Sequence, residues 1–214
     1  MSPSCMSCDR QPAEFRVPSY GDREVKETDM PRSSGQPPVV VVLGASGCIG
    51  SVFTAALARR RVRLRAVSRR PPPALGIATV ELYTADLTDP EQLRSAVDGA
   101  DVVVHCLAAA GAQGDDKADD CWVGLNAATM AGLLDAVASR PASSRPVTVI
   151  YAGSITQVGV PPRTLLDGTE ADLPVTAFER DKQAGESALL RASAEGQIEG
   201  ISVRLPTVFG HSPV

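Results

Sequence analysis

The segment that most constrains this fold is VVVVLGASGCIG, at residues 39–50. Its first five residues are apolar and do not alternate with polar ones, which is typical of a strand buried on both faces of a parallel sheet. Three glycines follow, at Gly44, Gly47 and Gly50. Apolar residues then recur at the spacing of one helix face: Ile49, Val52, Phe53, Ala56 and Leu57. A strand, a glycine turn and a helix therefore open an α/β fold.

This glycine turn also predicts a dinucleotide site. Glycine lets the backbone approach a pyrophosphate closely, and a helix N-terminus presents free N–H groups and a positive dipole end. An ordinary tight turn is the alternative for the glycines alone, but the strand before them and the helix after them favour the dinucleotide. The residues expected around the pyrophosphate are Gly44, Ser46, Gly47, Cys48, Ile49 and Gly50.

The second predicted strand, VRLRAVSRR at residues 62–70, indicates which dinucleotide binds. An NAD site places an acidic residue at the end of this strand, to bond the ribose 2′-hydroxyl. Here Ser68, Arg69 and Arg70 stand instead. A guanidinium pairs with a 2′-phosphate, which a carboxylate would repel. NADP(H) is therefore the expected cofactor, with Arg69 its first contact. The alternative for each arginine is a solvated charge before the turn.

The alternation of strands and helices continues along the chain. Further strands are expected over residues 79–84, 100–111, 146–154 and 200–210. Asp89 is positioned to cap a helix that starts at Pro90. A later helix carries one stripe: Trp122, Leu125, Asn126, Thr129, Met130, Leu133 and Val137. This order predicts a doubly wound parallel sheet of the Rossmann type, with ligands at the carboxyl ends of the strands.

Composition narrows the class of protein. The 214 residues are 43% hydrophobic and carry a formal net charge of −4, enough for one core and without the basic excess of a nucleic-acid-binding protein. We expect a cytoplasmic protein, because the sequence shows neither a membrane span nor a signal pattern. Residues 1–37 show no periodicity and predict a disordered extension, with translation from Met1 or Met30 both compatible. Residues 38–214 are the expected NAD(P)-binding domain.

We predict that the five cysteines are free thiols, because their number is odd and the sequence is typical of a cytosolic α/β protein. Cys5 and Cys8 form a single CxxC without a second pair, so no metal site is predicted. Cys48 and Cys106 fall within hydrophobic segments, where apolar packing is the expected role.

Six motifs together resemble the extended short-chain dehydrogenase/reductases. They are GASGCIG, the Asp86 turn, HCLAAAG with Asn126 after it, Ser154 behind the fifth strand, FERDK at 178–182 and RLPTVFG. More narrowly, VVVVLGASGCIGS, RLRAVSRR and GISVRLPTVFG look like the 4-ketoreductases that act on nucleotide-linked (dTDP) 4-keto-6-deoxyhexoses in antibiotic deoxysugar pathways. The resemblance extends from about residue 38 to the end of the chain.

This resemblance implies a role for each matching residue. Ser154 would hydrogen-bond the carbonyl oxygen of the sugar, and Lys182 would hold the nicotinamide ribose, with Asn126 fixing the lysine. Asp86 and Leu87 would contact the adenine edge, and Leu107 and Ala108 would line the cofactor. The structural alternatives are a strand end for Ser154, a solvated lysine, a packed asparagine and a plain turn at Asp86. Relatives often pair through the helices that hold Asn126 and Lys182, so a homodimer is compatible.

Two departures from the family pattern bear on activity. Phe178 stands where these enzymes place a tyrosine acid, and a phenyl ring has no proton to donate. Tyr151, inside the fifth strand, is not expected to replace it. Relatives also continue into a C-terminal substrate-binding portion that is largely missing here. The alternatives are therefore a non-catalytic NADP(H)-binding protein or inactive fragment, and an NAD-dependent epimerase or dehydratase. The latter is disfavoured by Arg69 and by SITQVG after the fifth strand.

Overall fold

The computed structural model describes residues 35–70, 80–107, 124–141, 145–160 and 170–208. The chain divides into two units between Gln36 and Pro37, and the fold presented here is that of the second unit. Ala108, Trp122 and the fifth cysteine, Cys121, lie outside the described ranges, as do residues 1–34 with Cys5, Cys8 and Met30.

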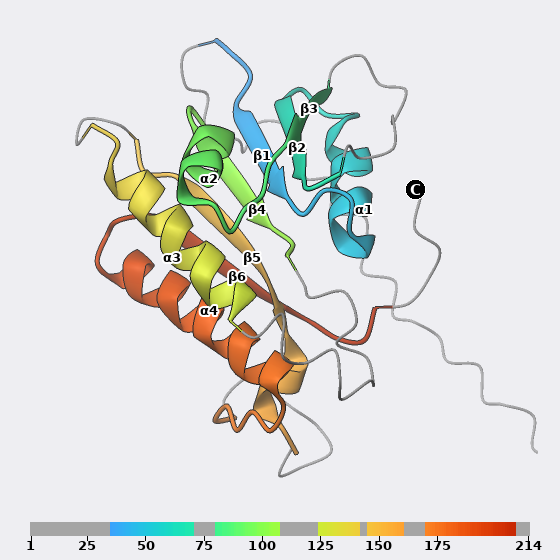
Figure 1. Cartoon of the computed structure of the whole chain (residues 1–214), viewed down its shortest axis with the longest axis vertical. Coiled ribbons are helices and arrows are strands. Elements are labelled where there is room, and N and C mark those ends of the chain that lie inside the picture. Colours follow the sequence, from blue (N-terminus) through green and yellow to red (C-terminus); the bar gives the residue numbers. More distant parts are fainter. Residues whose placement is uncertain (1–34, 71–79, 108–123, 142–144, 161–169, 209–214) are drawn as a thin grey trace, which may run out of the picture. The chain divides into compact units, whose positions relative to one another are not determined.

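Six parallel strands form a single sheet with the order β3-β2-β1-β4-β5-β6 (Figure 1). The strands are β1 Val39–Leu43, β2 Arg63–Ser68, β3 Val80–Thr84, β4 Val102–His105, β5 Thr148–Ser154 and β6 Glu199–Leu205. The chain moves outward from β1 to β3 and then returns to add β4 on the other side of β1, so the direction of winding reverses between β1 and β4. All six predicted strands and the doubly wound order are confirmed.

Within the described residues, the sheet is accompanied by the helices α1 Cys48–Leu57, α2 Pro90–Val97, α3 Leu125–Ala138 and α4 Ala177–Ala194 and by the short 3-10 helix η3 Ile155–Val158. Helices α2, α3 and α4 lie along one face and α1 lies on the other (Figure 1). Alternate residues of β1 face the two layers: Val41 and Leu43 pack with the α2–α4 side, Val40 and Val42 with the α1 side. Both faces of β1 are therefore buried, as its unbroken apolar run predicted.

The apolar stripe predicted for α1 is only partly confirmed: Ile49 and Leu57 pack against the core, but Val52 and Phe53 do not. Val52 and Phe53 are 51% and 39% exposed, whereas Gly50, Ser51 and Thr54 are buried. Small residues face the sheet because the first turn of α1 approaches the backbone of the glycine turn too closely for large side chains. Cys48, expected to pack in the core, is also exposed, while Cys106 is buried as predicted.

Local capping sets where two helices begin. Asp89 accepts hydrogen bonds from the backbone N–H groups of Glu91 and Gln92, as the sequence predicted for the start of α2 at Pro90. At α4, Thr176 and Glu179 form a reciprocal capping box. The stripe predicted for α3 is confirmed in its described part, where Asn126, Thr129, Met130 and Leu133 are buried. Among the described residues, no helix has the length and hydropathy of a membrane span.

Candidate active site

The glycine turn is built by backbone contacts alone. Gly44 has a φ of 82°, which favours glycine, and the N–H groups of Gly44 and Ala45 both donate to the Val67 carbonyl at 3.0 Å. A Cβ atom added to Gly50 would lie 2.2 Å from the Gly44 carbonyl oxygen. The helix can therefore start directly on the turn only with glycine at this position.

The N-terminus of α1 is open to a ligand. Gly47 is the N-cap residue and supplies no side-chain hydrogen bond to the helix, so the first N–H groups are not capped by a side chain. Ser46, Gly47 and Cys48 are exposed and Ile49 is half-buried. Uncapped N–H groups at the positive end of a helix fit a pyrophosphate, and the six residues predicted around it meet at this turn.

The end of β2 brings Arg69 and Asp86 near each other. Arg69 and Arg70 are exposed, while Ser68 is buried and its hydroxyl donates to the Arg70 carbonyl. The Asp86 carboxylate accepts from the backbone and hydroxyl of Thr88, and these bonds, aided by the Arg69 charge, lower its pKa. Leu87, predicted to bind the cofactor, is 5% exposed, and its side chain packs in the core.

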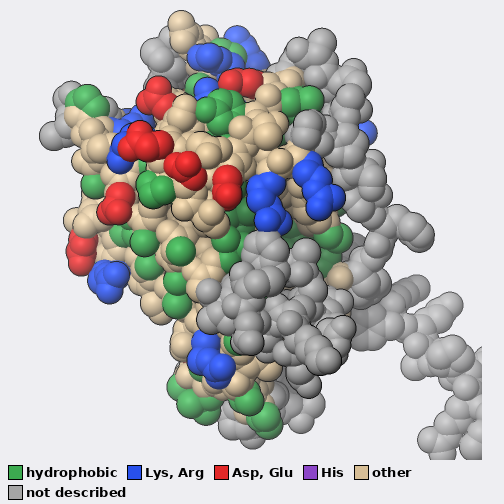
Figure 2. Space-filling view, in the orientation of Figure 1, with side chains coloured by type: hydrophobic (Ala, Val, Ile, Leu, Met, Phe, Trp, Pro, Cys, Tyr) green, Lys and Arg blue, Asp and Glu red, His purple; other side chains and the backbone are tan. Residues whose placement is uncertain are grey.

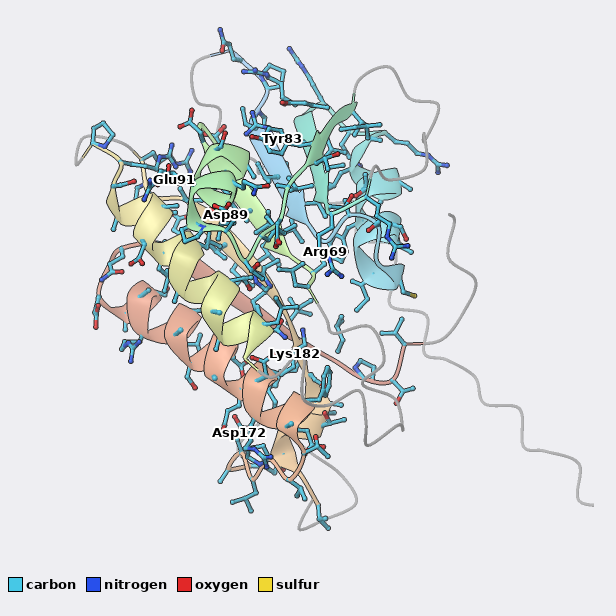
Figure 3. The ribbon with its side chains drawn as sticks, in the orientation of Figure 1. Arg69, Tyr83, Asp89, Glu91, Asp172 and Lys182 are labelled. Carbon is cyan, nitrogen blue, oxygen red and sulfur yellow. The ribbon has the colours of Figure 1, made fainter. Side chains whose placement is uncertain are left out.

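Lys182 reaches from α4 to the carboxyl ends of β4 and β5 (Figure 3). Its Nζ donates to the Leu107 carbonyl at 2.9 Å, to the Ala152 carbonyl at 2.8 Å and to Asn126 Oδ1 at 3.2 Å. The side chain is buried, and this burial lowers the pKa of Lys182 to about 8. A solvated helix lysine, the alternative considered from sequence, is wrong.

Asp181, the residue before Lys182, was missed by the sequence analysis. It fixes the orientation of Asn126, which in turn accepts a hydrogen bond from Lys182. Its carboxylate accepts from the backbone N–H groups of Asn126 and Ala127, at 3.0 and 3.1 Å, and from Asn126 Nδ2 at 2.7 Å. The N-cap of α3 is Gly124, which has no side chain to cap the helix, so Asp181 supplies that cap from α4. Because Nδ2 donates to Asp181, Oδ1 of Asn126 is left to accept from Lys182.

Ser154 ends β5 and caps η3. Its hydroxyl accepts from the Thr156 N–H at 3.3 Å and lies 2.8 Å from Thr156 Oγ1, while its own N–H donates to Gln157 Oε1 at 3.1 Å. Ser154 is half-buried and Thr156 is exposed. The backbone of Ser154 is therefore held in place, and its hydroxyl lies near solvent. Ser154 is at the carboxyl end of β5, where Lys182 also contacts the Ala152 carbonyl.

A network of hydrogen-bonded polar side chains holds the backbone of Ser154 in place. The sequence analysis missed this network as well. Gln157, fully buried, donates through Nε2 to Glu186, and Arg204 of β6 bonds both Glu186 and Asp172. Burial raises the pKa of Glu186, but the bonds from Arg204 and Gln157 outweigh it and hold this pKa below its usual value. Asp181, Lys182 and Glu186 lie on the buried stripe of α4, a polar run that could have been recognised from the spacing.

Phe178 lies in the first turn of α4, four residues before Lys182 and hence on the same side of the helix. It is half-buried. Tyr151 does not substitute for it, because its hydroxyl is buried and donates to the Lys182 carbonyl at 3.1 Å. Burial raises the pKa of the Tyr151 hydroxyl, which makes it a poor acid. Among the described residues, no cluster of three or more His, Cys, Asp or Glu side chains could hold a metal ion.

The family model described as "NAD dependent epimerase/dehydratase family" matches residues 40–213. The chain belongs to this family. The matched residues 40–213 include α1, Lys182 and all but the first residue of the sheet, so the candidate site lies within the part of the chain that matches this family.

Two curated relatives are similar over most of this chain. One is dTDP-6-deoxy-L-talose 4-dehydrogenase (NAD(P)(+)) of Kitasatospora kifunensis, 27% identical over 175 residues, or 81% of this chain and 54% of the relative. The other is D-erythronate dehydrogenase of Cupriavidus necator, 29% identical over 183 residues, or 79% of this chain and 55% of the relative. The chain spans about half the length of the curated relatives it matches.

Solved structures show the same fold. The nucleoside-diphosphate-sugar epimerase of Agrobacterium tumefaciens superimposes with a TM-score of 0.71 at 24% identity, covering 83% of this chain and 56% of that one. The GalE-like L-threonine dehydrogenase of Cupriavidus necator, in its holo form, gives 0.68 at 28% identity and covers 82% and 57%. The UDP-glucose 4-epimerase of Brucella ovis, solved in complex with NAD, gives 0.65 at 21% identity, covering 78% and 51%.

Proposed function

We propose that this chain binds NADP(H) and reduces the C4 keto group of a dTDP-linked 4-keto-6-deoxyhexose of antibiotic deoxysugar biosynthesis. The observation that carries the proposal is the buried Lys182 ammonium, held at the ends of β4 and β5 on the same sheet edge as Ser154. The Kitasatospora kifunensis relative is named for oxidation at C4 of a dTDP-6-deoxysugar, which is this reduction in reverse.

The cofactor residues have separate roles in this proposal. Uncapped N–H groups of Cys48 and Ile49 bind the pyrophosphate, and Gly44, Gly47 and Gly50 allow its close approach. Arg69 pairs with the 2′-phosphate, and Asp86 contacts the adenine edge. Lys182 binds the nicotinamide ribose and Ser154 donates to the sugar carbonyl. Leu107 and Ala108 line the nicotinamide side. NADPH, when bound, supplies the hydride.

The same proposal extends to the organisation of the chain. Residues 38–214 act as the NAD(P)-binding domain behind an extension of residues 1–37, and the site of action is the cytoplasm.

Phe178 favours a second candidate, an NADP(H)-binding protein without turnover. General acid catalysis contributes roughly 10²–10⁴ in rate. Relative to a typical turnover of about 10 per second, a site without its acid would turn over at about 10⁻¹ to 10⁻³ per second. The NAD-dependent epimerases of this family are a third candidate, which Arg69 disfavours because an NAD site places an acid at that strand end.

The cofactor preference is tested with Arg69→Asp, and Arg70→Asp is the matched control one residue further on. We expect the dissociation constant for NADPH to rise by about 100-fold, because a pairing guanidinium is replaced by a repelling carboxylate. The constant for NADH should change less than about threefold, and Arg70→Asp should leave both nearly unchanged. Fluorescence titration measures all four values. Equal losses for the two cofactors would contradict the assignment of Arg69.

The reaction itself is tested with Phe178→Tyr. Restoring a hydroxyl four residues before Lys182 should raise the rate of dTDP-4-keto-6-deoxyhexose reduction by about 100-fold, the lower range of general acid catalysis. Phe178→Leu is the control and should show no gain. A variant that binds NADPH but gains no activity with tyrosine would favour the non-catalytic candidate.

We also propose a homodimer formed through α3 and α4. The groove between these helices is lined by small and charged residues: Ala131, Leu134, Asp135, Ala188, Arg191, Ala192, Glu195 and Gln197. Leu190 is 49% exposed on α4, and hydrophobic side chains lie among acidic and basic ones on this face (Figure 2). Small residues allow close helix packing. Light scattering should show a dimer that Ala131→Glu converts to a monomer.

A further inference from the structure

The Ser154–Thr156 hydroxyl pair lies at the edge of the site where the family's tyrosine is absent. The two hydroxyl oxygens are 2.8 Å apart, and Thr156 is exposed whereas Ser154 is half-buried. Phe178 offers no proton. A pair of hydrogen-bonded hydroxyls that runs from solvent to the carbonyl-binding serine is the kind of group that can move one.

The hydrogen bonds of Ser154 Oγ define the direction in which a proton can pass between the two hydroxyls. The oxygen has two lone pairs and one proton. One lone pair accepts from the Thr156 N–H at 3.3 Å, and the other can accept from the Thr156 hydroxyl. With both lone pairs used, the Ser154 proton is directed away from Thr156, toward the side where a substrate carbonyl would bind. The Ser154 N–H, held by Gln157 Oε1, keeps the backbone in this position.

Two other candidate proton donors are already engaged. The three protons of the Lys182 ammonium have three acceptors, the carbonyls of Leu107 and Ala152 and the amide oxygen of Asn126. The Tyr151 hydroxyl donates to the Lys182 carbonyl and is fully buried. The exposed Thr156 hydroxyl, by contrast, is in direct exchange with water.

We propose that Thr156 relays a solvent proton through Ser154 to the substrate carbonyl oxygen, so that reduction proceeds without a tyrosine. This inference rests on the proposed function. Hydride from NADPH adds to C4, and the electron pair of the C=O bond moves to oxygen. That oxygen takes the proton of Ser154 Oγ, Ser154 takes the Thr156 hydroxyl proton, and Thr156 takes one from water, leaving hydroxide. NADPH is oxidised and the ketone is reduced to an alcohol. Thr156 is a positioning and relay residue that acts through Ser154.

The test compares Thr156→Val with Thr156→Ser in two backgrounds, the natural chain and Phe178→Tyr. Valine keeps the branched shape but has no hydroxyl, whereas serine keeps the hydroxyl. In the natural background we expect Thr156→Val to lower kcat by at least about tenfold with little change in KM, and Thr156→Ser to stay within about threefold. In the Phe178→Tyr background, Thr156→Val should cost less than about threefold, because tyrosine supplies the proton.

Solvent isotope effects separate proton relay from a structural role. In D₂O the natural chain should slow by about twofold or more, and this effect should fall in Phe178→Tyr, where one proton moves instead of three. NADPH affinity, measured by fluorescence without substrate, should be unchanged in Thr156→Val. A crystal structure of this variant should show the Ser154 hydroxyl rotated from its position in the natural chain, because one of its partners is lost.

Several outcomes would overturn the relay. An equal kcat loss from Thr156→Val in both backgrounds would mean that Thr156 only supports the loop. Turnover in the natural chain that Thr156→Val leaves within about threefold would refute the relay while the proposed function stands. No turnover in the natural chain would refute both. A chain that fails to bind NADPH would refute the proposed function first, and the relay with it.

Discussion

The two ends of the candidate site are constructed in different ways. At β1–α1 the ligand-facing groups are backbone N–H groups, and the geometry depends on glycines within seven residues of one another, from Gly44 to Gly50. At β5–α4 the groups are side chains that meet across the fold. Lys182 bonds residues that are 75, 56 and 30 positions away in sequence.

A short sequence motif can therefore specify the β1–α1 end of the site, whereas the β5–α4 end also depends on how distant segments pack together. A glycine turn is complete once the local chain has the right φ values and no Cβ atoms in the way. A buried lysine needs acceptors from three other segments, because a buried charge without hydrogen bonds is costly. The first kind of site tolerates changes elsewhere in the protein, and the second kind should not.

The largest effect is expected at Asp181. Replacing it by alanine leaves the N–H groups of Asn126 and Ala127 and the Asn126 amide without their acceptor. Each unsatisfied buried donor costs about 1–3 kcal/mol, so the free energy of unfolding should fall by about 4 kcal/mol. Urea denaturation measures it. Asp98→Ala, at an exposed position at the end of α2, is the control and should change it by less than about 0.5 kcal/mol. If both variants lowered the free energy of unfolding by similar amounts, the proposed difference between the two ends of the site would be wrong.

A smaller effect is expected at Gly50, where the constraint is local. An added Cβ would lie 2.2 Å from the Gly44 carbonyl oxygen, whereas one at Gly47 would lie 3.3 Å from the same atom. Gly50→Ala should lower the free energy of unfolding by about 2 kcal/mol, as overpacking does. We expect Gly47→Ala to cost less than half as much. Thermal or urea unfolding of the pair gives the answer, and equal costs would show that the turn relaxes freely.

The third effect concerns pH, builds up only above pH 8 and belongs to the lysine end alone. Burial lowers the pKa of Lys182 from 10.5 to about 8, so between these values the unfolded chain holds a proton that the folded chain has released. Stability from this group therefore rises with pH by about 1.4 kcal/mol per unit in that window and is constant below it. The substitution Lys182→Met removes this pH-dependent contribution to the free energy of unfolding.

The measurement is the difference in free energy of unfolding between the natural chain and Lys182→Met, followed from pH 7 to 10. This difference should move in favour of the natural chain above pH 8. Gly47→Ala, which leaves Lys182 in place, should run parallel to the natural chain. A constant difference across the range would show that Lys182 titrates normally and is not buried in solution.

The fold was predictable from sequence because its signals are local. Unbroken apolar runs such as Val39–Leu43 require burial on both faces, and Asp89 before Pro90 marks a helix start through its own side chain. The packing face of α1 was not predictable from apolar spacing. Close approach of the helix to the Gly44 carbonyl selects the small residues Gly50, Ser51 and Thr54, and Val52 and Phe53 remain exposed.

The same division holds for the candidate site. Ser154, Lys182 and Asn126 were predicted from their motifs, and the structure brings Lys182 and Asn126 within hydrogen-bonding distance. Asp181, Gln157 and Glu186 were not predicted. Their partners lie elsewhere in the fold: Asp181 binds the start of α3, 54 and 55 positions away, Gln157 binds Glu186, 29 positions away, and Glu186 binds Arg204, 18 positions away. The spacing on α4 indicates that Asp181 and Glu186 share one face of the helix, but it does not indicate which groups they will bond.

By itself, the sequence determined the parallel sheet, the glycine turn and the identity of Phe178 at the usual acid position. Each depends on what one short segment can do: bury an apolar run, approach a carbonyl without a Cβ, or lack a hydroxyl. Only the tertiary structure decided that Lys182 is buried with three acceptors and that Asp181 caps α3 from another helix. These features exist because distant segments are packed together, and burial turns otherwise ordinary polar residues into obligatory partners.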